Sequence, residues 1–176
     1  LPPNIVTIGA LAFTDCSSLT EIYIPKTLSN SGWAFYGSGI VTAEFEKGMT
    51  VIPEGVFEYA GNLKNVTIPD TVITIGNSAF GHCTSLETVS IPNSVTEIEI
   101  NAFYSCNTLQ EVALPLYLEE IGFGAFSKCE SLEKIEIPKS LKRVNTYSSF
   151  SSDAGVFYGC SNLNDITFET GTTSVI

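Results

Sequence analysis

The sequence predicts a right-handed solenoid of the α/β class that is dominated by strands, with parallel strands on one face and short 3₁₀ or α-helical turns on the other. Three observations predict this fold: a period of 23 residues, an Ala-Phe pair in the middle of most periods, and an alternation of apolar and polar residues at the end of each period. The 176 residues hold about seven such repeats. Because one repeat buries its apolar side only against its neighbours, the repeats must stack into a rod.

A short strand is expected where each repeat ends. The boundaries of the most regular repeats are marked by the dipeptides Ile68-Pro69, Ile91-Pro92, Leu114-Pro115 and Ile137-Pro138, whose prolines are 23 residues apart. Before each proline two apolar residues alternate with polar ones, as Val89 and Ile91 do. This period of two is typical of strands, and successive strands should pair in parallel. At a spacing of about 4.8 Å, seven strands would make a rod roughly 30 to 35 Å long.

The middle of each repeat is expected to form a turn around a buried phenylalanine. The phenylalanines of the Ala-Phe and Val-Phe pairs are Phe13, Phe35, Phe57, Phe80, Phe103, Phe126 and Phe157. Apolar residues follow them at spacings of three and four, which predicts a single turn of 3₁₀ or α-helix. Stacking of the repeats should align these rings into a spine that runs through the core.

A turn position precedes the Ala-Phe pair in every repeat. It holds Gly9, Gly32, Pro53, Gly76, Glu99, Gly122 and Asn145. Glycine and asparagine there suggest a positive φ, whereas proline cannot adopt one and glutamate would do so at a cost. The backbone geometry of this turn is therefore expected to vary between repeats.

Two repeats depart from the pattern. The repeat around Trp33 is shortened, and about eight residues are inserted between Val144 and Val156. Insertions in solenoids become loops, so Tyr147 and Phe150 in this segment form a candidate loop site. Neither end of the sequence carries an obvious polar cap, which predicts that residues 1–176 are one solenoid domain cut from a longer array.

The repeat unit resembles "IPxSVTxIGxxAFxxCxxLxxIxIP", and residues 69–91, 92–114 and 115–137 match it nearly throughout. On these residues the sequence resembles the BspA-like (Treponema pallidum type) leucine-rich repeat family. The resemblance covers essentially the whole chain and implies a right-handed leucine-rich repeat solenoid. It also implies a secreted or cell-surface protein, often an adhesin that binds extracellular-matrix proteins, cells or mucosal surfaces. It assigns no ligand residues.

The cysteines occupy one position of the repeat. Cys16, Cys83, Cys106, Cys129 and Cys160 each lie three residues after the phenylalanine, where other repeats have Ser38 and Ala60. A position that accepts Cys, Ser or Ala favours a small side chain that packs inward, so buried free thiols are expected. A disulfide between stacked repeats is an alternative, and a metal site is another, although close Cys pairs of the zinc type are missing.

No catalytic, metal-binding or cofactor-binding set emerges from the sequence. The only histidine, His82, is expected to face solvent without a nucleophile or an orienting group, and the carboxylates do not converge. No glycine-rich phosphate loop or calcium loop is present. The net charge of −11 opposes binding to nucleic acid and anionic lipid, and the apolar runs are too short for membrane insertion.

The outward side of the predicted strands is the candidate site, because leucine-rich solenoids usually bind there. The partner-facing residues are Glu21, Tyr23, Glu44, Asn65, Thr67, Thr88, Ser90, Glu111, Lys134, Glu136 and Asp165. This surface is small, hydroxylic and acidic, which suits a basic patch on a protein partner, and a solvated sheet face is the alternative interpretation. Tyr36, Tyr104 and Tyr158 should line up on the turn side. The leading interpretation is a non-enzymatic, extracellular, adhesin-like module, and the alternative is a structural spacer that projects other domains from the cell surface.

Overall fold

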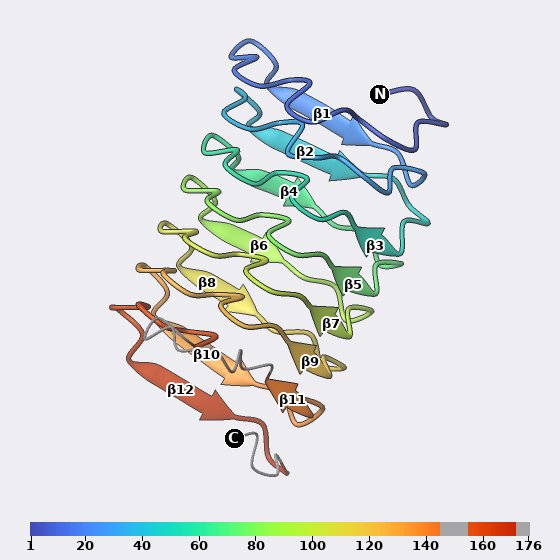
Figure 1. Cartoon of the computed structure of the whole chain (residues 1–176). Coiled ribbons are helices and arrows are strands. Elements are labelled where there is room, and N and C mark those ends of the chain that lie inside the picture. The colour runs from blue at the N-terminus through green and yellow to red at the C-terminus, as the bar shows by residue number, and fades with distance from the viewer. Residues whose placement is uncertain (145–154, 172–176) are drawn as a thin grey trace.

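The computed structural model describes residues 1–144 and 155–171, and these residues form a stack of parallel strands (Figure 1). One side of the stack carries β1 (Glu21–Ile24), β2 (Thr42–Phe45), β4 (Asn65–Thr67), β6 (Thr88–Ser90), β8 (Glu111–Ala113), β10 (Lys134–Ile137) and β12 (Asp165–Phe168). A second column contains β3 (Val51–Ile52), β5 (Thr74–Ile75), β7 (Glu97–Ile98), β9 (Glu120–Ile121) and β11 (Arg143–Val144). The candidate loop residues Tyr147 and Phe150 lie outside the described residues.

The strand register follows the period of the sequence. Val89 pairs with Val112, and Ile75 pairs with Ile98, so residues at the same position of successive repeats lie side by side. The expected parallel solenoid is therefore confirmed. The number of repeats differs slightly with the element that is counted, because residues 1–144 and 155–171 contribute seven strands to the first column and five to the second.

The turns are not helical in the described part of the chain, which corrects the expected 3₁₀ or α-helical segments. Single hydrogen-bonded turns do occur: the Cys83 N–H donates to the Phe80 carbonyl at 3.2 Å. The neighbouring amides bond instead to the next repeat, with the Phe80 N–H donating to the Ala102 carbonyl at 2.8 Å. A helix would need these amides for its own ladder, so bonding between repeats replaces it.

Positive φ angles recur at two positions of the repeat and also prevent helix formation. The first position, directly before the Ala-Phe pair, holds Leu11, Trp33, Gly55, Ser78, Asn101 and Gly124. The second, two residues after the phenylalanine, holds Asp15, Gly37, Tyr59, His82, Ser105, Lys128 and Gly159. The turn position predicted from Gly9, Gly76 and Gly122 does not have a positive φ in these three repeats. Gly32 is the one glycine at that position in the described repeats that agrees with the prediction, and Asn145 lies outside the described residues.

The core lies between the two strand columns and the turns, and the phenylalanine spine runs along it. The five central rings are fully buried: Phe35, Phe57, Phe80, Phe103 and Phe126. Phe103 is stacked between Phe80 and Phe126, with centroid distances of 5.2 Å on both sides. Phe13 and Phe157 at the two ends of the spine are only partly buried, because each has a phenylalanine on one side only. The predicted spine is therefore present.

The cysteines are free thiols, but they are not equally buried. Cys83, Cys106 and Cys129 are buried, and each Sγ lies within 3.3 Å of a phenylalanine carbonyl of an earlier repeat. Cys16 is exposed, which corrects the expectation that it packs inward. Its repeat is the first that the structure describes, and no earlier described repeat covers the thiol. Burial raises the pKa of the three buried thiols well above the usual value, which suppresses the reactive thiolate.

We expect iodoacetamide to modify Cys16 first when the protein is folded at pH 8, because only this thiol is exposed. Mass spectrometry of the intact protein should show one rapid adduct, followed slowly by Cys160, and five adducts after denaturation. A Cys16→Ser variant, which lacks the exposed thiol, should lose the rapid adduct. Fewer than five adducts in denaturant would contradict the assignment of free thiols.

Candidate functional site

The predicted partner-facing residues lie in two columns on the outer side of the longer strands, and we call this surface the strand face. In one column Glu21 pairs with Thr42, which in turn pairs with Asn65. In the other, Tyr23 pairs with Glu44, which in turn pairs with Thr67. All eleven predicted residues are exposed, while the residues between them, such as Val89 and Val112, point into the core. The alternation within each strand therefore brings them onto one surface.

The strand face keeps most of its negative charge. The Lys134 Nζ lies 3.2 Å from the Glu111 Oε1 across β8 and β10, and this exposed pair neutralises itself with little gain in stability. No lysine or arginine of the described residues forms an ion pair with Glu21, Glu44 or Glu136. These three carboxylates are available to a partner.

Tyr23 lies among carboxylates at one end of the strand face. Partial desolvation raises the pKa of its hydroxyl, and the carboxylates of Glu46 and Glu44 raise it further. A tyrosine hydroxyl is protonated at neutral pH even without this shift, so Tyr23 can donate a hydrogen bond beside an acidic rim.

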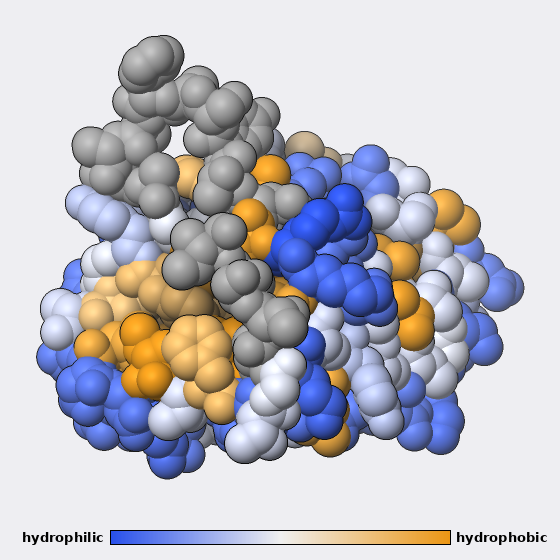
Figure 2. All heavy atoms as spheres, turned by 90° about the horizontal axis from the view of Figure 1, so that it is seen from below, coloured by the Kyte–Doolittle hydropathy of each residue, from blue (hydrophilic) through white to orange (hydrophobic). Residues whose placement is uncertain are grey.

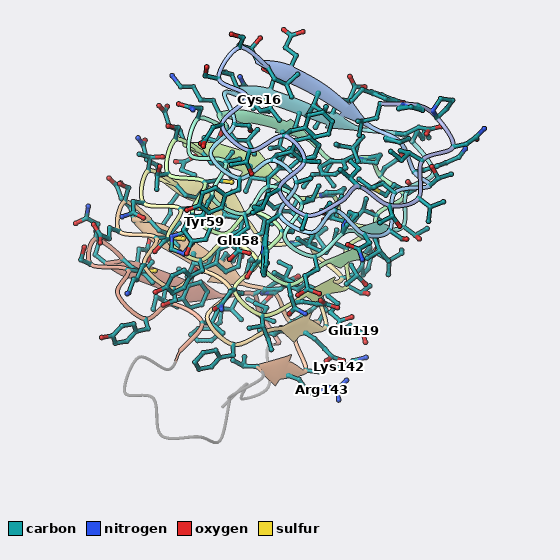
Figure 3. The ribbon with its side chains drawn as sticks, turned by 45° about the horizontal axis from the view of Figure 1, so that its top comes forward. Cys16, Glu58, Tyr59, Glu119, Lys142 and Arg143 are labelled. Carbon is teal, nitrogen blue, oxygen red and sulfur yellow. The ribbon has the colours of Figure 1, made fainter. Side chains whose placement is uncertain are left out.

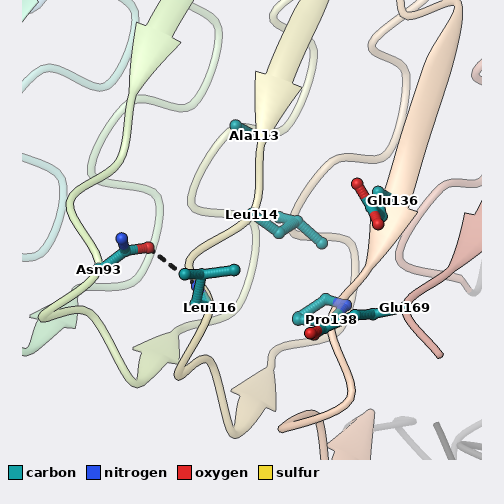
Figure 4. A pocket seen from close by; sticks show the side chains of 7 residues that line it. All are labelled: Asn93, Ala113, Leu114, Leu116, Glu136, Pro138 and Glu169. Carbon is teal, nitrogen blue, oxygen red and sulfur yellow. Dashed lines mark hydrogen bonds between the residues drawn. The ribbon is translucent and has the colours of Figure 1, made fainter. Parts of the chain in front are cut away.

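A hollow of about 330 Å³ adjoins the ends of β8 and β10 (Figure 4). Apolar side chains, two carboxylates and one asparagine line the hollow. The lining residues are Asn93, Ala113, Leu114, Leu116, Glu136, Pro138 and Glu169. Glu169 is bound to the Lys139 ammonium at 2.9 Å, which holds the pKa of Glu169 below its usual value. Glu136 is therefore the carboxylate of the hollow that is left for a ligand. Sequence reasoning identified Glu136 but missed the hollow, because Leu116 and Pro138 lie outside the strands.

The second strand column offers a partner fewer unpaired charges than the strand face does. The Lys142 Nζ lies 2.7 Å from the Glu119 Oε1, and Arg143 binds the Glu120 carboxylate (Figure 3). These ion pairs link the repeat of β9 to the repeat of β11. The four charged side chains therefore neutralise one another within the solenoid.

His82 belongs to an aromatic column on the turn side. Its ring stacks on Tyr59 at a centroid distance of 4.1 Å and meets Tyr104 edge-on at 5.1 Å. The Tyr36 ring packs against Tyr59 in a tilted arrangement, at a centroid distance of 5.0 Å. We call Tyr36, Tyr59, His82 and Tyr104 the aromatic column. His82 is thus half-buried between rings rather than freely solvated, and desolvation lowers the pKa of its imidazole.

The aromatic column differs from the expected alignment of Tyr36, Tyr104 and Tyr158. Tyr36 and Tyr104 directly follow the spine phenylalanine, whereas Tyr59 and His82 come one residue later. The column therefore draws on two positions of the repeat. Aligning the repeats one position at a time therefore does not reveal the aromatic column.

Neither a metal-binding cluster nor a membrane-spanning helix occurs in the described residues. Residues 1–144 and 155–171 contain no group of three or more His, Cys, Asp or Glu side chains placed to hold a metal ion. Within the same residues, no helix has the length and hydrophobicity that a membrane span requires.

Comparison with known proteins identifies similar sequences and folds. A family described as "BspA type Leucine rich repeat region" matches residues 1–109 and 74–176 in six copies. A leucine-rich repeat protein from Bacteroides ovatus is 28% identical, with a TM-score of 0.77 over 97% of this chain and 45% of its own. The T. pallidum Leucine Rich Repeat protein is also 28% identical, with a TM-score of 0.66 over 84% of this chain and 62% of its own. This chain thus spans less than two thirds of either protein. The search of curated proteins found no match.

Proposed function

This chain belongs to the BspA-type leucine-rich repeat family, and from that premise we propose that it is a non-enzymatic interaction module that binds a protein partner through the strand face. Proteins of this repeat class expose an extended surface, which suits binding more than it suits enclosing a reaction. We further propose an adhesin-like role outside the cell or at its surface, with a host or cell-surface protein as the partner.

The observation that carries the proposal is the hollow beside Glu136. Its apolar side chains Leu114, Leu116 and Pro138 can cover the methylene stem of a long basic side chain, while Glu136 meets the charge at its end. The free carboxylates of Glu21 and Glu44 extend the same charge preference along the strand face. A basic patch on the partner is therefore the complementary surface.

Charge reversal tests this proposal. We expect the triple variant Glu21→Lys, Glu44→Lys and Glu136→Lys to bind the partner at least about tenfold more weakly, because it repels the basic patch. Surface plasmon resonance against a panel of purified extracellular-matrix proteins, at 150 mM salt, measures the effect. Glu111 is left unchanged because it is paired with Lys134.

The matched control reverses three acids outside the strand face, with Asp15→Lys, Glu97→Lys and Glu130→Lys. It changes the net charge by the same amount and should leave the affinity within about twofold, since salt screens distant charges. If both triple variants weaken binding equally, the partner responds to net charge and the strand face is not its site.

The second candidate is a structural spacer within a longer array, and the exposed end of β12 favours it. Ile166 and Phe168 are 52% and 60% exposed, whereas their register partners Ile135 and Ile137 in β10 are buried. Figure 2 shows hydrophobic side chains in the surface at this end of the stack. We propose that residues 1–176 form a single domain on which further repeats stack. A spacer predicts no saturable binding to any protein of the panel.

A further inference from the structure

A second hollow, of about 360 Å³, opens on the turn side at the N-terminal end of the aromatic column. It is lined by Leu11, Trp33, Tyr36, Glu58 and Tyr59. The three aromatic rings remain 41–52% exposed. The Trp33 Nε1 donates a hydrogen bond to the Glu58 carboxylate, and Glu58 and Tyr59 lie next to one another on the turns (Figure 3). The hollow thus combines aromatic faces with an acid.

The backbone holds Trp33 at this hollow. Trp33 has a φ of 56°, and its indole lies against Gly55, where an added Cβ would come within 2.8 Å of the ring. An adjoining hollow of about 270 Å³ places Glu54 beside the same indole. Trp33 therefore lies between two acids, in the shortened repeat that departs from the sequence pattern.

The charge of the hollow is not neutralised from within the described chain. No lysine or arginine of residues 1–144 and 155–171 forms an ion pair with Glu54 or Glu58. Partial burial raises the pKa of Glu58, and its hydrogen bonds from Trp33 and Ser78 oppose the shift. A cation brought to this carboxylate would relieve the desolvation cost of its charge.

The other end of the aromatic column shows which group such rings accept. There the Lys128 ammonium lies over the Tyr104 ring, 5.4 Å from its centroid. An ammonium or guanidinium on an aromatic face is attracted by the negative potential of the ring. In the repeat that follows Tyr36, the position equivalent to Lys128 holds Tyr59, and in the first two repeats it holds Asp15 and Gly37, so none of these repeats supplies a cation at this position.

We propose that the hollow of Trp33, Tyr36, Tyr59 and Glu58 binds an arginine or lysine side chain of a protein partner. The aromatic rings hold the planar or tetrahedral cation, and Glu58 accepts its hydrogen bonds. This site is separate from the strand face, because it lies on the turns and uses none of its residues. The proposal therefore does not depend on the proposed function.

The single tryptophan makes the site directly observable, because the fluorescence and the indole N–H resonance come from Trp33 and from no other residue. The probe is the peptide acetyl-Gly-Ser-Arg-Gly-Ser-amide. We expect a saturable change in both signals, and the peptide with citrulline in place of arginine, which lacks the charge, should bind at least about tenfold more weakly. A lysine peptide should also bind.

Two substitutions and one control locate the binding. Glu58→Gln retains an acceptor for Trp33 but removes the charge, and Tyr36→Ala removes one ring; each should weaken binding by about tenfold. Tyr158→Ala removes an equally exposed tyrosine at the same position of another repeat and should change nothing. Circular dichroism of each variant verifies the fold. The strand-face triple variant should still bind the arginine peptide.

Three results would overturn the proposal: no saturable change with the arginine peptide, equal binding of the citrulline peptide, or an unchanged affinity in a folded Glu58→Gln variant. Saturation by a neutral oligosaccharide or an acidic peptide, without a response to arginine, would assign the hollow to another class of ligand.

Discussion

Replacing Phe103 with alanine is expected to lower the free energy of unfolding by about 3–5 kcal/mol. Phe103 is fully buried and stacks on Phe80 and Phe126. Truncation therefore leaves a cavity in the middle of the spine and removes ring contacts with both neighbours. Because each repeat is stabilised mainly by the repeats beside it, the loss weakens two interfaces at once.

Chemical denaturation followed by circular dichroism measures this effect, and two matched Phe→Ala variants calibrate it. Phe13 stacks on Phe35 alone and is partly exposed, so its truncation should cost roughly half as much. Phe168 is 60% exposed, and its truncation should cost less than about 1 kcal/mol. Equal losses in the three variants would show that the spine does not carry the stability assigned to it.

The period of the sequence is sufficient to predict the solenoid, the longer strands and the buried spine. The alternation around Val89 and Ile91 gives both the strand and its outward residues. The second strand column escapes the same reasoning because each of its strands has two residues, as Thr74 and Ile75 do in β5. Two residues are too few to show a period of two.

The turns could not be predicted because ordinary side chains occupy their positive φ positions. A positive φ is suggested by glycine in a sequence, but it is not suggested by residues such as Tyr59, His82 and Lys128. The hydrogen bonds between repeats hold these residues in place, and such bonds leave no local signature. The aromatic column and the hollow at Trp33 both depend on this backbone. The shortened repeat marks Trp33 as unusual, but it does not indicate which residues Trp33 contacts.

The exposure of Cys16 shows a further limit of repeat reasoning. Cys16 and Cys83 share one position, yet only Cys83 is covered by an earlier repeat. Position within a repeat predicts which way a side chain points, whereas position within the stack decides whether a neighbour buries it. Ile166 and Phe168 in the last described strand are likewise exposed, although their register partners in β10 are buried.

Replacing Gly122 with alanine is expected to destabilise the protein by about 1–3 kcal/mol or more. A Cβ on Gly122 would lie 2.4 Å from the carbonyl carbon of Glu99 and from the amide nitrogen of Ile100. These are backbone atoms of the preceding repeat and cannot rotate away as a side chain would. The Gly122 N–H also donates to the Ile98 carbonyl at 2.6 Å, so separating the repeats would weaken this bond.

Gly9 provides the matched control, since it occupies the same position of the repeat and has no atom within 4 Å of an added Cβ. Neither glycine has a positive φ, so Gly9→Ala should be neutral or slightly stabilising through the unfolded chain. Thermal unfolding of the two variants shows which cause accounts for the destabilisation expected of Gly122→Ala. A general cost of replacing glycine at this position would appear in both variants, whereas close approach between repeats makes only Gly122→Ala costly. A similar decrease in Tm for both variants would contradict the close approach.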